Sequence, residues 1–199
     1  MRLFDLFFSG NFSGNSESSA AKESPLAPAQ AAKTAFEKLT GGKGAIAEAV
    51  RSCASDTEAY FRTHPAILAR RGMHYSPEAE PWLLVIAAVE AAEDNGFLRE
   101  LDAGCPAEEF TAALQAVLAG RGIEFSLKNI LFDSKMNLTA WVERFNEYAG
   151  QSGITLYFVD LYGSRAPMGA STIADYAEAA EIAGAAGIAI TSRPVFGDL

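Results

Sequence analysis

Acidic residues gather in one short stretch of the chain, between Glu78 and Glu109. The stretch holds nine acids and the single base Arg99, a net charge of −8, whereas the other 167 residues hold 16 acids and 15 bases. Net charge acts on association and solubility rather than on fold. The chain is therefore a nearly neutral body with one acidic region, and that region indicates a surface for a cationic partner.

Part of this acidity has a local explanation, because acids stabilise the positive end of a helix dipole. That explanation covers the acids at predicted helix starts, which are Glu78, Glu80, Glu108 and Glu109. The other candidates for partner binding are Glu90, Glu93, Asp94, Glu100 and Asp102. The first three lie at the end of a predicted helix, on one face, where they oppose the dipole and repel one another.

We expect this second set to hold Lys and Arg side chains of a basic protein partner. Two alternatives stay open. The acids can form a solvated surface that salt screens, or they can bind a divalent cation, although Asp94-Asn95-Gly96 lacks the ligand spacing of a calcium loop.

A second candidate is the loop that follows the predicted strand Ile154–Val159. Ligands of open α/β sheets bind beyond the carboxyl ends of the strands, so Asp160 could act as a base or metal ligand while Ser164 and Arg165 contact an anion. This alternative ligand loop would make the chain a small-ligand-binding protein or a hydrolase-like enzyme. The simpler interpretation is a turn in which Arg165 pairs with a nearby acid.

Other chemistry is poorly supported by the sequence. Cys53 and Cys105 have no CxxC partner, which argues against a zinc site or a disulfide framework and predicts reduced thiols. His64 and His74 lie in no metal-ligand frame. We expect no cofactor, no bound metal and no catalytic residue. The acidic balance argues against nucleic-acid binding, and no apolar run is long enough to span a membrane.

The periodicity predicts an α+β (mixed α/β) chain. A small polar arm, residues 1–24, precedes a single globular domain, residues 25–199, with a helical part (25–120) and an α/β part (121–199). The apolar segment Leu3–Phe8 is expected to dock on the core. Strands are predicted at 123–127, 154–159 and 188–191, with a loop at 163–169. The alternation of strands and helices favours a small parallel or mixed sheet.

The chain resembles a bacterial family of small acidic proteins known only as a domain of unknown function. The residues that carry the resemblance are Pro81–Leu84, Phe97–Asp102 and Leu156–Asp160, together with the closing helix and strand. Some proteins of this kind are associated with toxin–immunity systems, including contact-dependent growth inhibition and polymorphic toxin systems. The resemblance implies a non-enzymatic role in neutralising a toxin.

The sequence therefore predicts a cytoplasmic immunity or inhibitor protein whose acidic surface binds a cognate toxin domain, which is a basic protein such as a nuclease. It predicts no oligomeric state. A regulatory or scaffold protein is a further alternative.

Overall fold

The computed structural model describes residues 27–42, 44–161 and 163–196, without the side chains of residues 78, 80 and 81. The predicted arm, residues 1–24, and the segment Leu3–Phe8 lie outside the described residues. The elements follow in the order α1 (Pro28–Thr40), α2 (Gly44–Ser55), α3 (Thr57–Thr63), α4 (Pro65–Arg70), the 3-10 turn η2 (Pro77–Ala79), α5 (Glu80–Asp94), β1 (Leu98–Asp102), α6 (Ala107–Arg121), α7 (Leu138–Gly150), β2 (Ile154–Val159), β3 (Arg165–Thr172), α8 (Ile173–Ala185) and β4 (Ile190–Thr191).

The four strands form one antiparallel sheet in the order β1-β3-β2-β4. The α+β class is confirmed, with most helices in the N-terminal half, but the prediction of a parallel or mixed sheet is wrong. The physical reason is the connection 160–164 between β2 and β3. Parallel neighbours need a crossover of a dozen or more residues, whereas a short loop returns the chain as a hairpin.

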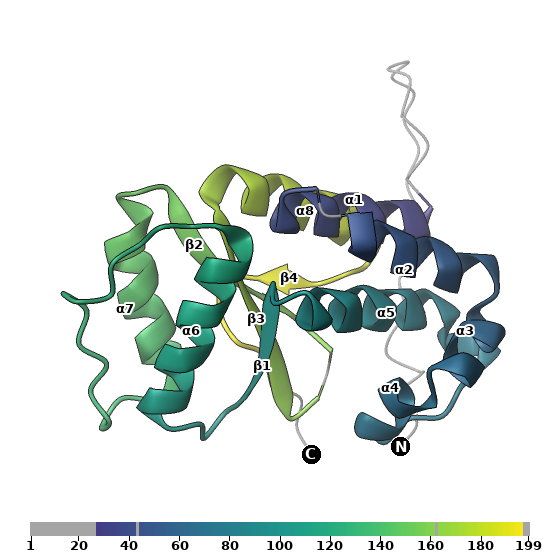
Figure 1. Cartoon of the computed structure of the whole chain (residues 1–199), viewed down its shortest axis with the longest axis horizontal. Coiled ribbons are helices and arrows are strands. Elements are labelled where there is room, and N and C mark those ends of the chain that lie inside the picture. The colour runs from purple at the N-terminus through teal and green to yellow at the C-terminus, as the bar shows by residue number, and fades with distance from the viewer. Residues whose placement is uncertain (1–26, 43, 162, 197–199) are drawn as a thin grey trace, which may run out of the picture.

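Helices cover both faces of the sheet (Figure 1). Leu156 and Phe158 point to one face, where they pack in a core with α6 and α7. Tyr157 and Val159 point to the other face, where they pack with α1, α2, α5 and α8. This alternation follows from the two-residue period of a strand, and all six residues of β2 are buried because neither face meets water.

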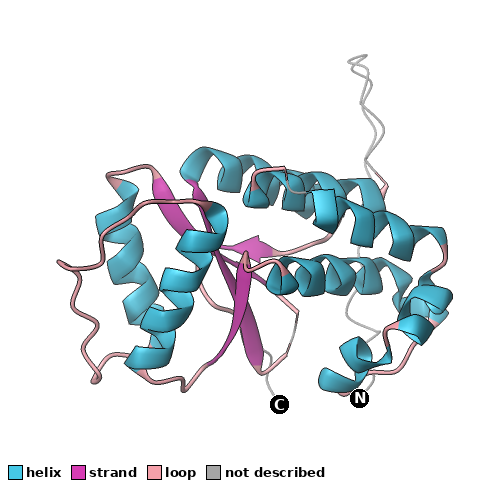
Figure 2. Cartoon of the chain, in the orientation of Figure 1, coloured by secondary structure: helices cyan, strands magenta, loops and turns pink. Residues whose placement is uncertain are grey.

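The predicted helix that ends with Glu90, Glu93 and Asp94 is α5, and it ends before Gly96 (φ 80°). Its residues 83–90 are all buried. One side of α5 packs in the core that contains α1 and α8, and the other packs against Cys53, Phe61 and Leu68 of α2, α3 and α4. The helix is apolar all round because other helices lie on both sides of it (Figure 2).

Three predicted details of the strands are wrong. Residues 123–127 form no strand, residues 165–172 form β3 where a loop was expected, and β1 was not predicted as a strand. The segment of β3 contains Pro167 and Gly169, and both residue types weaken strand interiors. Its sequence therefore lacks the usual pattern of a strand. The β2–β3 ladder runs only as far as Met168, so Pro167 lies just beyond its end and needs no N–H there.

Gly169 lies directly opposite Tyr157, and a Cβ atom at Gly169 would meet the Tyr157 ring. Tyr157 is fully buried and cannot move aside into solvent. We therefore expect Gly169→Ala to lower the free energy of unfolding by about 1–3 kcal/mol, the usual cost of overpacking a core. Urea unfolding followed by circular dichroism measures this loss.

Gly184 provides the matched control. It lies inside α8, and a Cβ atom there would meet nothing within 4 Å. Because alanine favours helix over glycine by about 1 kcal/mol, Gly184→Ala should leave stability unchanged or raise it. Equal losses in both variants would contradict the proposed contact between Gly169 and the Tyr157 ring.

Candidate functional site: an arginine–carboxylate cluster and an acidic edge

Glu90 is buried near the end of α5 and is paired with two arginines from the end of α4. Its side chain is 6% exposed. Arg70 Nη2 contacts Oε2 of Glu90, while Arg71 donates to Oε1 from Nε at 3.2 Å and from Nη2 at 2.7 Å. An enclosed carboxylate is costly without such partners. The adjacent pair Arg70-Arg71 therefore supplies, from within the chain, the cations that the sequence led us to seek in a partner.

The same arginines reach the other enclosed carboxylates. Arg71 Nη2 lies 2.6 Å from Oε1 of Glu100 as an ion pair, and Glu100 is only 7% exposed. Arg70 Nη2 lies 3.4 Å from Oε2 of Glu93. Arg99 donates from Nη1 to the carbonyl oxygen of Glu93 at 3.1 Å, which places a cation at the negative end of α5. The charges that oppose the α5 dipole are thus compensated locally.

The strand register brings Arg165 to the same place. Asp102 of β1 lies opposite Arg165 of β3, with Arg165 Nε 3.6 Å from Oδ1 of Asp102. Glu100 lies two residues away on the same side of β1, and Arg165 Nη1 is 3.3 Å from its Oε2. The simpler interpretation of Arg165, a base paired with a nearby acid, is confirmed.

We call this group the arginine–carboxylate cluster. It consists of Arg70, Arg71, Glu90, Glu93, Glu100, Asp102 and Arg165. Four carboxylates face three guanidinium groups, so the cluster is close to neutral. Of the five acids predicted to bind a partner, Glu90, Glu93 and Glu100 are largely enclosed and paired inside the chain, whereas Asp94 and Asp102 are exposed.

The structural basis of the alternative ligand loop is absent. Asp160 and Ser164 lie in the hairpin connection between two antiparallel strands, not beyond a parallel strand. Asp160 is buried, and its N–H donates to the carbonyl oxygen of Ala189 at 3.0 Å. Ser164 is exposed, and Arg165 belongs to the arginine–carboxylate cluster. Tyr162, in the same loop, lies outside the described residues.

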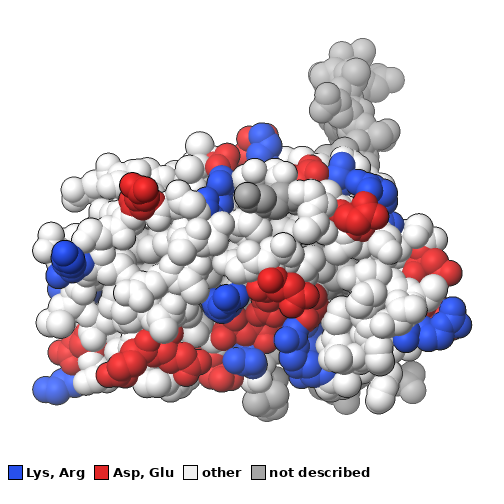
Figure 3. Space-filling model, in the orientation of Figure 1, with Lys and Arg blue, Asp and Glu red and all other residues white. Residues whose placement is uncertain are grey.

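One exposed acid of this cluster, Asp102, and two exposed acids beside the cluster lie where β1 passes into α6. Asp102 ends β1, and Glu108 and Glu109 occupy the first turn of α6. Glu108 and Glu109 form no ion pair with any described residue. Figure 3 shows acidic side chains running from the end of α5 toward the start of α6, with basic ones among them in the middle of the face. We call Asp102, Glu108 and Glu109 the acidic edge.

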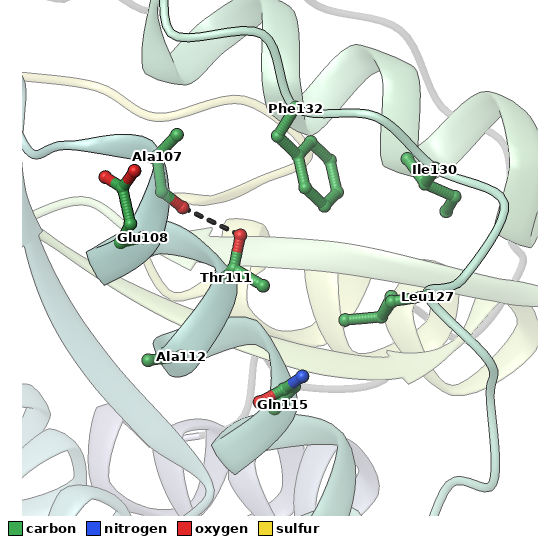
Figure 4. Close-up of a pocket in the computed structure, with 8 residues that line it drawn as sticks. All are labelled: Ala107, Glu108, Thr111, Ala112, Gln115, Leu127, Ile130 and Phe132. Atoms are coloured by element: carbon green, nitrogen blue, oxygen red, sulfur yellow. Dashed lines mark hydrogen bonds between the residues drawn. The ribbon is translucent and has the colours of Figure 1, made fainter.

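A hollow lies along α6 beside the acidic edge and was not predicted. It has a volume of about 430 Å³ and lies between α6 and the irregular segment that follows α6. Figure 4 shows Leu127, Ile130 and Phe132 facing α6 across it, with Glu108 at the helix start. Phe132 packs edge-on against Phe110, with ring centres 5.0 Å apart. The wall on the side of the irregular segment is therefore apolar and packs on the core, whereas the α6 side also carries Glu108, Thr111 and Gln115.

The candidate site lies within a stretch of the chain that matches a known protein family. The family model described as a domain of unknown function, DUF6630, matches residues 31–194. The chain belongs to this family. The match includes the arginine–carboxylate cluster, the acidic edge and the hollow of this DUF6630 domain. No curated protein matches the chain, and no solved structure does.

The remaining polar chemistry of the DUF6630 domain is sparse in the described part of the chain. Cys53 and Cys105 are buried and are not joined in a disulfide, and burial with the nearby Glu109 and Asp102 raises the pKa of Cys105. Within residues 27–42, 44–161 and 163–196, no three His, Cys, Asp or Glu side chains are grouped to hold a metal ion. None of the described helices combines the length and the apolar character needed to cross a membrane.

Arg71 touches both of the most enclosed carboxylates of the cluster, Glu90 and Glu100. Replacing it leaves two carboxylates short of their charge partner, and breaking a buried ion pair costs about 3–5 kcal/mol. We expect Arg71→Met to lower the free energy of unfolding by about that amount in urea titrations. Arg62→Met is the control, because Arg62 is exposed on α3 and has no ion pair with a described residue. A loss of similar size at Arg62 would argue against a special role of Arg71.

Glu93 should make stability depend on pH. Burial raises its pKa, as does the neighbouring Glu100 carboxylate, while Arg71 and Arg70 oppose the rise. A raised folded-state pKa means that the folded chain holds this proton more tightly than the unfolded chain. The resulting stabilisation is complete below pH 4.5, the ordinary value for Glu, and is lost as pH rises through the folded-state pKa.

Glu93→Gln removes this titration and keeps the shape of the side chain. We expect wild type to lose stability relative to Glu93→Gln as pH is raised upward from 4.5. Chemical unfolding of both proteins across this range gives the difference in their free energies of unfolding at each pH. Taking the difference removes the contribution that the other carboxylates make to both proteins. A difference that stays constant with pH would show that the pKa of Glu93 is not raised.

Proposed function

We propose that this DUF6630 domain is a non-enzymatic binding protein that neutralises a basic protein partner, and that the acidic edge is its contact surface. The observation that carries the proposal is the separation of two kinds of acid. Glu90, Glu93 and Glu100 form ion pairs with arginines of the same chain. Glu108 and Glu109 are exposed and face no base among the described residues. Lys and Arg side chains of a partner would pair with Glu108 and Glu109.

Exposed charges of this type act mainly on the rate of association. A patch of one sign steers a partner of the other sign and favours the correct orientation. Each exposed ion pair adds little affinity once formed, because water and salt screen it. The acidic edge is therefore suited to fast capture of a basic surface, which is what an inhibitor of a damaging protein requires.

The hollow along α6 supports the same proposal, because affinity needs a buried anchor. Apolar side chains seated in well-packed pockets carry most of the binding energy of protein interfaces. The hollow is lined by Leu127, Ile130 and Phe132 and begins at Glu108. It suits one bulky apolar side chain of the partner that lies beside a Lys or Arg in the partner's surface.

The resemblance described above suggests the finer form of the proposal. The partner would be a toxin domain, with a basic nuclease as the leading case, and the DUF6630 domain would act in the cytoplasm as its immunity protein. The alternative ligand loop is less well supported, because it joins two antiparallel strands and ligands of open α/β sheets bind beyond the carboxyl ends of parallel strands.

The test uses charge reversal at residues that make no ion pair with a described residue. Glu90 and Glu93 are unsuitable, since reversing them would break the arginine–carboxylate cluster. Immobilised wild type and Glu108→Lys/Glu109→Lys are exposed to a lysate of the source cells, and proteins held by wild type alone are purified. We expect such a protein to be basic and to associate with the double variant at least about tenfold more slowly at low salt. Stopped-flow fluorescence measures the rate, and co-expression tests rescue of cell growth.

Glu58→Lys/Glu181→Lys is the matched control, with the same charge change on exposed residues of α3 and α8. It should associate at nearly the wild-type rate. Equal slowing in both double variants would mean that only total charge matters. The proposal is overturned if wild type alone holds no basic protein, or if the chain does not relieve the toxicity of the protein that it holds.

A further inference from the structure

The hollow along α6 is elongated in the direction of that helix. The α6 residues that line it are Ala107, Glu108, Thr111, Ala112 and Gln115. Residues three and four apart are neighbours on a helix surface. At 1.5 Å per residue, the stretch from Glu108 to Gln115 covers about 10 Å of α6. The hollow therefore follows about two turns of the helix.

The two ends of the hollow differ in charge. Glu108 lines the end at the start of α6, where the acidic edge lies, whereas Gln115 lines the other end. Among the described residues that line the hollow, none is basic. Lys128 is exposed and directly follows Leu127, which Figure 4 shows nearer to Gln115 than to Glu108. An occupant that matches this gradient carries its cations at the start of α6.

Between these ends the hollow offers a place for an apolar side chain. Figure 4 shows Thr111 pointing from α6 toward the side of Leu127 and Phe132. The Thr111 hydroxyl donates to the carbonyl oxygen of Ala107 at 2.7 Å, so its hydrogen bond is made within α6. An apolar side chain that enters here meets apolar neighbours, one helical turn from Glu108.

We propose that the basic partner presents an amphipathic helix that lies along the hollow, antiparallel to α6. One bulky apolar side chain of this helix enters the hollow beside Thr111. Lys or Arg side chains one and two turns later in the partner helix pair with the acidic edge. Laying the apolar face of a helix into a groove is a recurring mode of recognition. The inference rests on the proposed function, and it names the element of the partner that is bound.

Charge selects the antiparallel direction. Bases are favoured in the last turn of a helix, because they compensate its negative end. A partner helix antiparallel to α6 brings this last turn to Glu108, so the same bases stabilise the partner helix and the contact. The parallel direction would bring the first turn of the partner helix to Glu108. Helices favour acids in that turn, and those acids would be repelled by the acidic edge.

A synthetic peptide tests this contact without the natural partner. The probe is an alanine-based helix of about 18 residues, with one tryptophan in the middle and lysines one and two turns later. Glutamines elsewhere keep it soluble, and a fluorescent label is attached to its N-terminus. We expect it to bind the wild-type chain at low salt with a dissociation constant of about 100 µM. Fluorescence anisotropy measures the binding.

Two control peptides have nearly the same composition. In the first, the lysines lie one and two turns before the tryptophan, so the charges favour the wrong direction. It should bind at least about fivefold more weakly than the probe. In the second, prolines on both sides of the tryptophan break the helix, and this peptide should bind at least about tenfold more weakly.

Filling the hollow should block the probe. Thr111→Phe places a ring where the tryptophan is expected, and it should weaken binding by about tenfold or more. Thr63→Phe is the matched control, because Thr63 is exposed on α3 and its hydroxyl also donates to the carbonyl oxygen four residues earlier, at 3.0 Å. It should bind like wild type. Gln115→Trp, at an exposed residue of the lining, replaces Thr111→Phe if circular dichroism shows that variant to be unfolded.

The charge variants described above complete the test. Glu108→Lys/Glu109→Lys should weaken binding of the probe at low salt by about tenfold, whereas Glu58→Lys/Glu181→Lys should change it little. Added salt should reduce the difference between the two double variants, because salt screens exposed charges.

Four outcomes overturn the inference. They are no binding of the probe at about 1 mM, equal binding of the two lysine orders, equal binding of the proline peptide, and wild-type binding by a folded variant with a filled hollow. Equal binding of the proline peptide would mean that the hollow takes an extended segment instead of a helix.

Failure of the inference and failure of the proposed function give different results. If the chain neutralises a basic protein through Glu108 and Glu109 but does not bind the probe, the proposed function stands and the helix does not. If the chain binds the probe as expected but neutralises no protein of the source cells, the proposed function fails.

Discussion

The arrangement of the DUF6630 domain depends on the burial of two carboxylates, Glu90 and Glu100, against one guanidinium group. Removing charge from water costs several kcal/mol per ion unless a partner is close. Arg71 meets this requirement for both acids at once. Since Arg71 directly follows α4 while Glu90 lies on α5 and Glu100 on β1, this contact holds α4 against α5 and the sheet. The surrounding packing is apolar and by itself specifies no such register.

This pairing also decides where the charge of the chain is available. Arginines from outside the acidic stretch neutralise its centre, and what remains accessible is Asp94 at one end and the acidic edge at the other. The surface view shows acidic side chains with basic ones among them (Figure 3). The ion pairs divide these acids into a structural part, which holds elements together, and an exposed part, which can act on a partner at a distance.

The irregular segment that follows α6 bounds the hollow. Connections of this length without a helix or strand are uncommon in compact domains and often carry function. Here the segment is held by the contact of Phe125 with Phe145, by the packing of Phe132 on Phe110, and by a hydrogen bond from Trp141 Nε1 to the carbonyl oxygen of Asp133 at 2.9 Å. Its inner side, with Leu127, Ile130 and Phe132, forms one wall of the hollow.

The sequence by itself determined the elements whose signals are local. Local patterns predicted a helical part at 25–120, which contains α1 to α6, and strands at 154–159 and 188–191, which contain β2 and β4. It also singled out the acids that the structure clusters. Only the tertiary structure decided the partners. Arg70 and Arg71 are 19 or more residues from Glu90, and Arg165 is 65 residues from Glu100. Sheet direction, β3 with its proline and glycine, and these ion pairs depend on contacts distant in sequence, which periodicity does not encode.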